Sequence, residues 1–274
     1  MLHPGKMGVF VAACLQKGDH IVYWASEGRS SQTRQRAEEF HLEDAGTLAR
    51  LCEICEVIVS VCPPDAAEQV AAQALAHSFR GLYLDANAIA PQRAVQIGHR
   101  MAQAEVSFVD GGIIGGPIWQ PGRTWLYLSG KKAGEVAALF AAGPMETRNI
   151  GDEIGQASAL KMCYAAYTKG TTALLCSIRA AAEALGVRGE LEEQWSRNWA
   201  GFTEETRERV RGVTAKAWRF QGEMEEIAAT FRSVGLPGEF HEGAEKIYQR
   251  LAKYKDETSE PALEEVLRAL TQSS

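Results

Sequence analysis

The stretch that decides the fold is a glycine turn at the beginning of the sequence, Leu2-His3-Pro4-Gly5-Lys6-Met7-Gly8. An apolar segment with helical spacing, Val9–Gln16, follows it directly. Glycine at position 5 allows the backbone to approach a phosphate, and glycine at position 8 allows a helix to pack closely on a strand. The first N–H groups of that helix have no intrahelical partner and can bind an anion. A glycine pair also marks many ordinary turns, so the surrounding elements must decide its role.

Around this turn, residues 1 to about 150 alternate between short apolar runs and helical patterns. The apolar runs predict strands at Ile21–Trp24, Val57–Val61, Gly81–Asp85, Val106–Asp110 and Trp125–Ser129. Helical patterns such as Ser30–Phe40 and Ala66–His77 fill the gaps. Strands and helices in alternation indicate a doubly wound parallel sheet. With the glycine turn, this predicts an α/β domain of the Rossmann type over residues 1–151.

Only Met1 and Leu2 precede His3, although this fold places a strand before the glycine turn, in the centre of the sheet. We therefore expect that the first strand is a stub or that the start of the chain is truncated.

The sequence changes character after Gly151. From Asp152 to Leu185 it is rich in alanine and free of proline, and Gly186 is a helix stop signal. Such a helix would be about 50 Å long at 1.5 Å per residue, so we expect it to connect two domains or two subunits. Further helices are predicted at Glu190–Phe202, Glu204–Ala229 and Glu239–Tyr254. Residues 152–274 thus form an all-α C-terminal domain.

The composition excludes several classes of protein. The 274 residues carry a net charge of −6, which argues against nucleic acid as a partner, because nucleic-acid binders usually carry a basic face. No apolar run approaches the roughly 18 residues of a membrane helix, and the first residues lack the pattern of a signal peptide. We therefore expect a cytoplasmic protein without a membrane partner.

The cysteines lie in apolar stretches and are interpreted as reduced, small core residues. They are Cys14, Cys52, Cys55, Cys62, Cys163 and Cys176. Cys52 and Cys55 form a CxxC pair, which could be a redox pair or half of a zinc site. No second pair and no paired histidines complete a zinc site, so we expect no bound metal.

The tip of the second strand is where a Rossmann-type domain reads the cofactor ribose, about twenty residues after the glycine turn. NAD enzymes usually carry Asp or Glu there, whereas this chain has Ala25 and Ser26, followed by Glu27, Arg29 and Arg34. A hydroxyl and a guanidinium suit the 2′-phosphate of NADP. Ser26 and Arg29 therefore favour NADP. Glu27 keeps NAD as the alternative, and the arginines could also be ordinary solvated charges.

Three segments downstream of the turn carry motifs of their own. Ser60-Val61-Cys62-Pro63-Pro64 follows a predicted strand. Asp85-Ala86-Asn87-Ala88-Ile89-Ala90-Pro91 matches the pattern Asp-x-Ser-Thr-x-x-Pro, with Asn87 and Ala88 in the hydroxyl positions. The third segment is similar to the motif Asp-Ala-Pro-Val-Ser-Gly-Gly, with Ile114 in place of the serine. It reads Asp110-Gly111-Gly112-Ile113-Ile114-Gly115-Gly116-Pro117.

Together with the turn, these motifs resemble the β-hydroxyacid dehydrogenase superfamily, which includes 6-phosphogluconate and 3-hydroxyisobutyrate dehydrogenases. The resemblance covers nearly the whole chain and points to a phosphogluconate-dehydrogenase-like branch with its own C-terminal helical domain. The family's turn reads Gly-x-Gly-x-Met-Gly, so His3 stands where its first glycine lies. The resemblance implies cofactor binding by Gly5, Lys6, Met7, Gly8, Cys62, Pro63 and Asn87. It also implies that the N–H groups of Gly115 and Gly116 bind a substrate carboxylate.

A lysine on the long helix carries the implied chemistry. Gly155-Gln156-Ala157-Ser158-Ala159-Leu160-Lys161 resembles the family's Gly-x-Gly-x-x-x-Lys segment, which makes Lys161 the general acid/base of a dehydrogenase. Without the resemblance, Lys161 would read as a surface lysine. The family's asparagine one turn later is Ala165 here, and Tyr164 or Thr168, on the same helix face, could replace its hydrogen bond.

Three functions follow for comparison with the structure. The first is an NADP-dependent oxidoreductase acting on a small hydroxy or oxo acid, working as a homodimer. The second is an imine reductase on the same scaffold, which Ala165 and Ile114 favour and Lys161 opposes. The third is a cofactor-binding protein that has lost catalysis. His241 could contact the substrate, but a surface histidine is the preferred interpretation.

Overall fold

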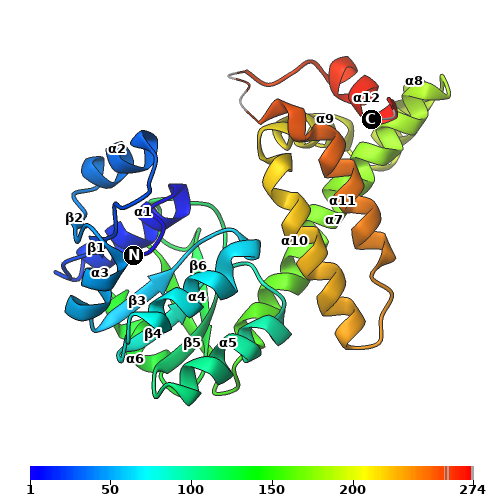
Figure 1. Cartoon of the computed structure of the whole chain (residues 1–274). Coiled ribbons are helices and arrows are strands. Elements are labelled where there is room, and N and C mark those ends of the chain that lie inside the picture. Colours follow the sequence, from blue (N-terminus) through cyan, green and yellow to red (C-terminus); the bar gives the residue numbers. More distant parts are fainter. Residues whose placement is uncertain (256, 258, 273–274) are drawn as a thin grey trace. The chain divides into compact units, whose positions relative to one another are not determined.

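The computed structural model describes residues 1–255, 257 and 259–272 of the chain (Figure 1). These residues form two compact units, Met1–Met162 and Cys163–Ser274. The long helix α7 (Gln156–Ala184) contains the boundary between the units. The boundary expected at residue 151 coincides instead with the end of the last strand, β7 (Glu146–Gly151).

The first unit is built on a mostly parallel sheet, as the sequence predicts. Five strands are hydrogen-bonded in the order β3 (Val57–Ser60), β4 (Leu82–Asp85), β5 (Ser107–Ile114), β6 (Trp125–Ser129) and β7. β3, β4 and β5 are parallel, whereas β6 runs antiparallel to β5. The sheet is therefore parallel-dominant, as a Rossmann-type domain predicts, with β6 as the strand at which the direction reverses. Only residues 115–124 connect β5 to β6, and a parallel crossover needs a dozen residues or more.

The first residues of the chain occupy the place of a central strand. The N–H of Leu2 donates to the carbonyl oxygen of Val59 in β3 at 3.1 Å. On the other side, the Met1 amino group donates to the carbonyl oxygen of Tyr23 at 2.7 Å. Tyr23 belongs to β1 (Tyr23–Trp24), which pairs in parallel with β2 (Glu43–Asp44). The two residues thus connect the two-stranded pair to the five-stranded sheet, at the place where this fold has its first strand.

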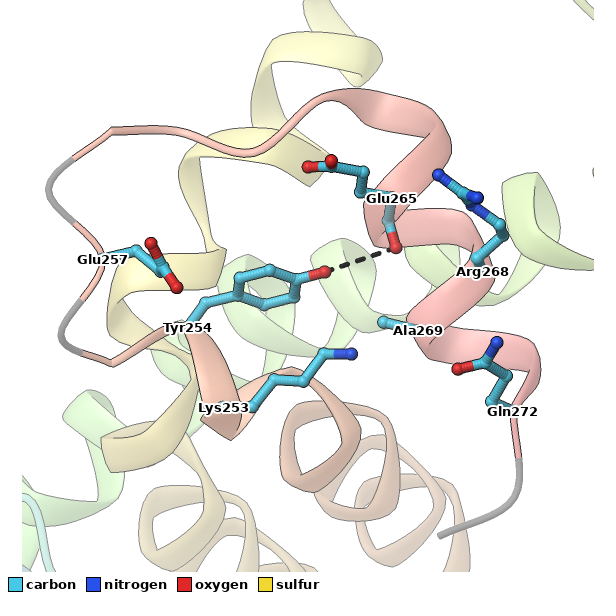
Figure 2. Close-up of a pocket in the computed structure, with 7 residues that line it drawn as sticks. All are labelled: Lys253, Tyr254, Glu257, Glu265, Arg268, Ala269 and Gln272. Carbon is cyan, nitrogen blue, oxygen red and sulfur yellow. Dashed lines mark hydrogen bonds between the residues drawn. The ribbon is translucent and has the colours of Figure 1, made fainter.

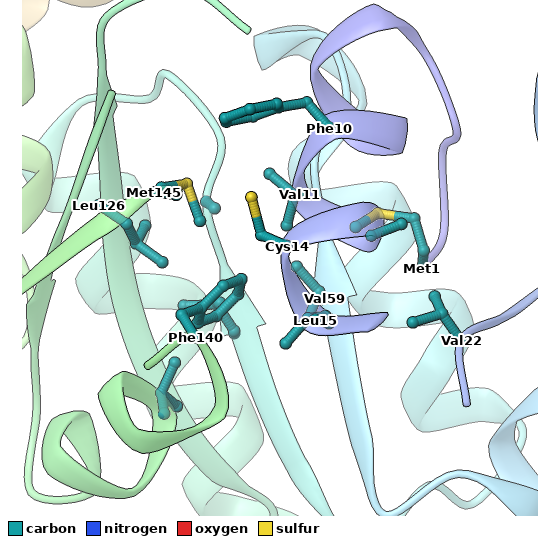
Figure 3. Close-up of a cluster of buried hydrophobic side chains, with 14 of the residues drawn as sticks. Met1, Phe10, Val11, Cys14, Leu15, Val22, Val59, Leu126, Phe140 and Met145 are labelled. Atoms are coloured by element: carbon teal, nitrogen blue, oxygen red, sulfur yellow. The ribbon is translucent and has the colours of Figure 1, made fainter. Parts of the chain in front are cut away.

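Helices cover both faces of this sheet. They are α1 (Lys6–Gln16), α2 (Ser31–Glu39), α3 (Leu48–Ile54), α4 (Ala67–Ala76), α5 (Pro91–Gln103) and α6 (Ala133–Leu139). A 3-10 turn, η1 (Pro64–Ala66), precedes α4. Leu84 of β4 packs in the cluster of α1 and α6, whereas its neighbour Tyr83 packs in the cluster of α4 and α5. Side chains alternate between the faces of a strand, so these are two separate cores. Figure 3 shows the first of them.

The second unit is helical in all its described elements. After the C-terminal part of α7 come α8 (Arg188–Asn198), α9 (Phe202–Gly212), α10 (Thr214–Ser233), α11 (Glu239–Leu251), the 3-10 turn η2 (Ala252–Tyr254) and α12 (Leu263–Thr271). The single helix expected over Glu204–Ala229 was wrong, because the chain divides into α9 and α10 at Val213. Among the helices that the structure describes, none is long and apolar enough to cross a membrane.

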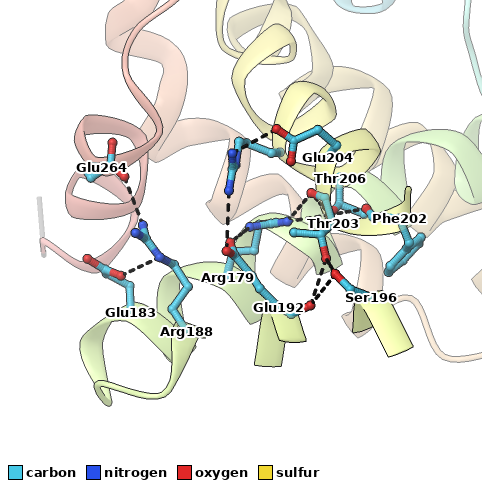
Figure 4. A network of polar contacts seen from close by, with 11 residues as sticks. Arg179, Glu183, Arg188, Glu192, Ser196, Phe202, Thr203, Glu204, Thr206 and Glu264 are labelled. Carbon is cyan, nitrogen blue, oxygen red and sulfur yellow. Dashed lines mark hydrogen bonds and ion pairs between the residues drawn. The ribbon is translucent and has the colours of Figure 1, made fainter. Parts of the chain in front are cut away.

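A buried arginine ties three helices of this unit together. Arg179 of α7 is fully buried, and its guanidinium donates to Glu192 of α8 at 2.5 Å. It also donates to the Thr203 carbonyl and the Thr206 hydroxyl of α9, each at 2.6 Å (Figure 4). A buried charge is tolerated only when it is paired and hydrogen-bonded, so this network fixes the packing of α7, α8 and α9.

The six cysteines are free thiols, but they do not all lie in the core. Cys14, Cys52 and Cys176 are buried, and Cys55 and Cys62 are partly buried. Cys163 is exposed, so its interpretation as a core residue was wrong.

Candidate functional site

A row of buried polar side chains crosses the sheet where the parallel strands end. Ser60 of β3 pairs in register with Asp85 of β4, Asp85 with Asp110 of β5, and Asp110 with Ser129 of β6. Each of the four is at most 1% exposed. Buried polar groups need hydrogen-bond partners, and these partners turn out to be the loops and the helix that carry the predicted site.

Asn87 joins the loops that follow β3 and β4. Its side-chain oxygen accepts the N–H of Cys62 at 2.6 Å, and its amide nitrogen donates to Ser60 Oγ at 3.1 Å and Asp85 Oδ2 at 3.0 Å. Asn87 is 2% exposed. Both polar atoms of the side chain are therefore engaged in positioning the Cys62–Pro63 loop.

Burial also sets the protonation of this cluster. Burial raises the pKa of Asp85 to about 7, and the neighbouring Asp110 carboxylate adds to this against the hydrogen bonds of Asn87. Burial, followed by the Asp85 carboxylate, raises the pKa of the Cys62 thiol to about 12. Cys62 is therefore a neutral thiol at physiological pH.

Asp110 holds the first turn of α7 against the sheet. Its Oδ2 accepts the N–H groups of Gly155 and Ser158, both at 3.0 Å, and its Oδ1 accepts the Ser158 hydroxyl at 2.6 Å. Ser129 Oγ donates to the same carboxylate at 3.1 Å and accepts the N–H of Ala157 at 3.1 Å. A carboxylate at a helix N-terminus satisfies N–H groups that have no intrahelical partner. Asp110 is thus the cap of α7, supplied from β5.

The first turn of α7 also places Lys161 directly over β5. A Cβ added to Gly112 would lie 2.6 Å from the Ala157 carbonyl oxygen and 3.1 Å from Lys161 Cβ. Only glycine allows α7 to approach the strand this closely. Lys161 is partly buried. The lysine therefore leaves its helix beside the Gly-rich end of β5, where the sequence predicts the substrate.

Gly115 and Gly116 follow at the end of β5. Gly115 has a φ of +108°, and a Cβ there would lie 2.4 Å from the Arg123 carbonyl oxygen. The Thr124 hydroxyl donates to the Gly116 carbonyl, which closes the loop 116–124 on itself. Both glycines are accessible. Their backbone can therefore approach a ligand without interference from a side chain.

The glycine turn lies on the same edge, before α1. A Cβ on Gly8 would lie 2.1 Å from the His3 carbonyl oxygen, so position 8 requires glycine. A Cβ on Gly5 would meet nothing within 4 Å, so the space above the turn is open. In the described structure no side chain caps α1, and its first turn carries no acidic residue. Its first N–H groups, at Lys6, Met7 and Gly8, are therefore available to an anion.

Three arginines surround this turn and the tip of β1. Arg29 Nη2 donates to the Leu2 carbonyl at 3.3 Å, and Arg36 Nη1 donates to the Pro4 carbonyl at 3.1 Å. Arg34 Nη2 donates to the carbonyl of the buried Ser26 at 2.7 Å. Arg36 was not among the residues predicted from the sequence.

His3 and Arg29 each carry a buried nitrogen that lacks a partner. Among the described residues, nothing hydrogen-bonds to His3 Nδ1 or Arg29 Nε. Burial, together with the nearby Arg29 guanidinium, lowers the pKa of His3 to about 4. The imidazole is therefore neutral at physiological pH in the ligand-free protein.

Comparison with known families agrees with this geometry. Residues 4–134 match the NAD binding domain of 6-phosphogluconate dehydrogenase, and residues 182–251 match a domain of unknown function, DUF1932. The N-terminal part of the chain is therefore similar to the NAD binding domain of 6-phosphogluconate dehydrogenase.

A curated relative and a solved structure have sequences similar to this chain. An uncharacterised 28.5 kDa protein of Methanothermus fervidus is 31% identical over 170 residues, which is 61% of this chain and 64% of that protein. The match thus spans slightly less than two thirds of this relative's length. A conserved protein of unknown function, described as structurally similar to 3-hydroxyacid dehydrogenases, is 26% identical with a TM-score of 0.67. That alignment covers 92% of this chain and 95% of the other.

More distant structures show the shared fold alone. The 3-hydroxyisobutyrate dehydrogenase of Mycobacterium tuberculosis, solved with L-serine, has a TM-score of 0.70 at 15% identity and covers 99% of this chain and 98% of its own. A reductive aminase of Aspergillus terreus, solved in complex with NADPH, has a TM-score of 0.56 at 16% identity. Its alignment covers 97% of this chain and 96% of the reductive aminase.

Within the region that matches the NAD binding domain, the predicted cofactor residues follow the first elements of the fold. Ser26 and Arg29 follow β1, and the loops with Cys62–Pro63 and with Asn87 follow the parallel strands β3 and β4. The Arg29 contact with the Leu2 carbonyl joins the tip of β1 to the glycine turn. The carboxyl ends of parallel strands form one edge of the sheet, which is where this fold binds its ligands. The cofactor contacts themselves stay predictions.

Tyr164 and Thr168 lie in the second unit. Tyr164 is exposed, while the Thr168 hydroxyl donates to the Tyr164 carbonyl of its own helix at 3.2 Å. Ala165, at the place of the family's asparagine, is buried. A substrate contact by Tyr164 or Thr168 stays a prediction.

His241 is not the surface residue that the sequence suggested. It is 4% exposed, with its ring 4.5 Å from that of Phe231 and 5.1 Å from that of Phe240. Burial lowers the pKa of His241. The surface interpretation failed because α11 turns this position toward α10.

The second unit also has an open groove of about 560 Å³ beside α12 (Figure 2). Lys253, Tyr254, Glu257, Glu265 and Arg268 are among the residues that line it. Its side chains carry both signs of charge, and none of the predicted site residues lines it.

Proposed function

We propose that this protein is a nicotinamide-dependent oxidoreductase that acts on a small, carboxylate-bearing hydroxy or oxo acid. The observation that carries the proposal is the position of Lys161. The Asp110 cap and the Gly112 contact hold this lysine against β5, three residues before Gly115, in a chain whose N-terminal part matches an NAD binding domain.

The cofactor edge fits a dinucleotide. The space above Gly5 is open, the first N–H groups of α1 face it, and two buried nitrogens beside it, on His3 and Arg29, lack partners among the described residues. These groups would hold the phosphates. When bound, the nicotinamide supplies or accepts the hydride.

We favour NADP over NAD. Ser26 and Arg29 stand where the 2′-phosphate is read, and Arg34 adds a third polar group. Arginine gives planar, charge-assisted hydrogen bonds that suit a phosphate. Glu27, which is exposed at the same tip, is the feature that supports NAD.

Lys161 is the proposed general acid/base. In oxidation, its neutral Nζ takes the proton of the substrate hydroxyl; in reduction, its ammonium returns a proton to the oxygen. The N–H groups of Gly115 and Gly116 hold the substrate carboxylate and orient it. Lys161→Ala should lower kcat by about 10²- to 10⁴-fold with dinucleotide affinity unchanged. Lys131→Ala, at an exposed lysine, is the matched control.

The first test is a titration of the purified protein with NADPH and NADH, followed by nicotinamide fluorescence. Tighter binding of NADPH supports the roles of Ser26 and Arg29, whereas tighter binding of NADH overturns the choice of cofactor. A protein that binds neither is not the proposed enzyme. Hydroxy acids with NADP⁺, and oxo acids with NADPH, then define the substrate.

Reduction of imines is the second candidate function. The Aspergillus terreus reductive aminase shares the fold, and Ala165 and Ile114 remove polar groups that a hydroxyacid enzyme of this family carries. A panel of cyclic imines with NADPH, run beside the oxo acids, separates the two. A protein that binds NADPH but loses nothing on Lys161→Ala would instead be a cofactor-binding protein without catalysis.

We also propose that the protein is a homodimer. Tyr164, Tyr167 and Leu174 lie on one face of α7 and are 46%, 70% and 46% exposed. Apolar side chains that line up on an exposed helix face mark an interaction surface, and a second copy of the same helix is the proposed partner. Tyr167→Glu should give a monomeric mass in light scattering at micromolar concentration. Val234→Glu, at an exposed turn, should leave the mass unchanged.

A further inference from the structure

The glycine turn differs from the pattern of its family at one residue, His3. The family carries glycine there, and a glycine leaves room for the dinucleotide phosphates but offers them no side chain. His3 instead carries a partly buried imidazole that lies near the Arg29 guanidinium, three residues before Lys6, where α1 begins. A side chain at this position must either obstruct the phosphates or bind them.

The polar atoms around His3 point to binding. His3 Nδ1 and Arg29 Nε are both buried, and each is without a hydrogen-bond partner in the described part of the chain. Leaving two such nitrogens unsatisfied costs folding free energy. Arg29 is also held in place, because its Nη2 donates to the Leu2 carbonyl at 3.3 Å, next to His3.

The charges identify the kind of ligand that satisfies both nitrogens. Arg29 is always a cation, and the first N–H groups of α1 add partial positive charge. A second cation would not be stable among these groups. An anionic oxygen would accept from Arg29 Nε, from the helix N–H groups and from His3 Nδ1 at the same time. The space above Gly5, in the same turn, is open to such an oxygen.

We propose that His3 is a cofactor-binding residue whose Nδ1–H donates a hydrogen bond to the pyrophosphate of the dinucleotide, beside Arg29 Nε. The inference rests on the proposed function, which supplies the dinucleotide. It assigns to His3 a contact that the glycine of the family pattern cannot make. It also gives Arg29 a pyrophosphate contact in addition to the one proposed at the 2′-phosphate.

Three substitutions at one position separate binding from obstruction. His3→Gly restores the family pattern, His3→Leu keeps a bulky side chain without a donor, and His3→Asn places an amide donor near the position of Nδ1. His77→Gly, at an exposed histidine that ends α4, is the matched control. Dissociation constants are measured for NADPH by fluorescence. The thermal unfolding midpoint without ligand identifies any variant that does not fold. The two His3 variants that remain still show whether a donor at this position strengthens NADPH binding.

If His3 binds the phosphates, His3→Gly and His3→Leu should each weaken NADPH binding about tenfold, the value of one charge-assisted hydrogen bond. His3→Asn and the control should stay within about threefold of the wild type. Equal or tighter binding by His3→Gly would show that His3 only obstructs the turn and would overturn the inference. Equal losses in the Gly, Leu and Asn variants would also overturn it, because the donor would then be irrelevant.

ADP-ribose, which has the pyrophosphate but no nicotinamide, locates the contact. Measured by competition, its affinity should fall by the same factor as that of NADPH in His3→Gly and His3→Leu. Unchanged ADP-ribose binding would place His3 elsewhere along the cofactor and overturn the pyrophosphate assignment. A wild-type protein that binds no dinucleotide refutes the proposed function and this inference together. If the wild-type protein binds NADPH and His3→Gly binds it equally well, the proposed function stands and only the inference about His3 is refuted.

Discussion

Substitution of Gly112 by alanine tests how Lys161, the proposed general acid/base, is positioned. The new Cβ would lie 2.6 Å from the Ala157 carbonyl oxygen, a backbone atom, and 3.1 Å from Lys161 Cβ. Real Cβ atoms do not approach within 3.0 Å, so the first turn of α7 must move away from β5 by at least 0.4 Å (3.0 minus 2.6). That movement strains the hydrogen bonds from Gly155 and Ser158 to Asp110.

The strain should appear in both stability and catalysis. Forcing an extra methyl group into a packed core costs about 1–3 kcal/mol, measured as the loss in free energy of unfolding in urea. A displaced catalytic group costs up to about 100-fold in rate per ångström, so a movement of 0.4 Å should lower kcat by up to about sixfold. Dinucleotide affinity should remain, because the glycine turn, Arg29 and Asn87 do not contact this turn of α7.

Gly189→Ala is the matched control, because a Cβ there would meet nothing within 4 Å and the residue lies inside α8. It should leave kcat unchanged and stabilise the protein by about 0.5–1 kcal/mol, the usual gain of alanine over glycine in a helix. If Gly112→Ala is as stable and as active as the wild type, α7 does not pack on β5 as described, and Lys161 is not held there.

Three further predictions concern stability. Because burial raises the pKa of Asp85 to about 7 in the folded protein from 3.8, the folded state binds more protons in this interval. The stability that Asp85 contributes below about pH 4 is therefore lost as pH rises from about 4 to about 7. This loss lowers the free energy of unfolding by at most about 4 kcal/mol. Urea titrations of wild type and Asp85→Asn should diverge over that window. His241 acts in the opposite sense, since its lowered pKa means that stability is lost as pH falls below 6.5; His241→Phe should weaken that loss, measured by thermal unfolding at pH 5 and 7. Ser158→Ala removes the hydroxyl bond to Asp110 and should cost about 1.5–3 kcal/mol in urea unfolding, whereas Ser177→Ala, whose hydroxyl bonds only its own helix, should cost less.

The sequence predicted three strands to within one residue of their limits, namely β3, β4 and β6. Each of them coincides with a short apolar run, which is the pattern of a strand in this fold. β7 was missed, since its residues Glu146–Gly151 are largely polar and pair only with β6. β2 consists of two exposed acidic residues and exists through its pairing with β1. Such strands are defined by their neighbours and have no pattern of their own.

The helical half shows a different limit of sequence patterns. Helical spacing continues from Glu204 to Ala229, so a single helix was expected, whereas α9 ends and α10 begins at Val213. α12 was not expected, because it is short and follows a proline-containing segment. Where helices end inside a helical unit depends on packing against other helices, which periodicity does not report.

At the candidate site, the sequence identified residues but not their partnerships. The motif with Asp110 was assigned to substrate binding, and its carboxylate proved to be the cap of α7, forty-five residues further along the chain. One signal was available: the start of α7 at Gly155-Gln156-Ala157 has no Ser, Thr, Asp or Asn immediately before the helix to cap it. A long helix without a local cap has to find its acceptor elsewhere in the structure.

A cap supplied from β5 has a consequence for catalysis that a local cap would not have. A local cap moves with its helix, whereas Asp110 belongs to the sheet, one strand away from the Asp85 and Asn87 cluster that orders the cofactor edge. The first turn of α7 is thereby held by two backbone N–H groups, by the Ser158 hydroxyl and by the Gly112 contact. Lys161 lies one turn beyond these constraints, so its distance from the end of β5 is set by the sheet. Under the proposed function, Ala165 at the place of the family's asparagine should therefore leave the position of the lysine intact and alter the choice of substrate.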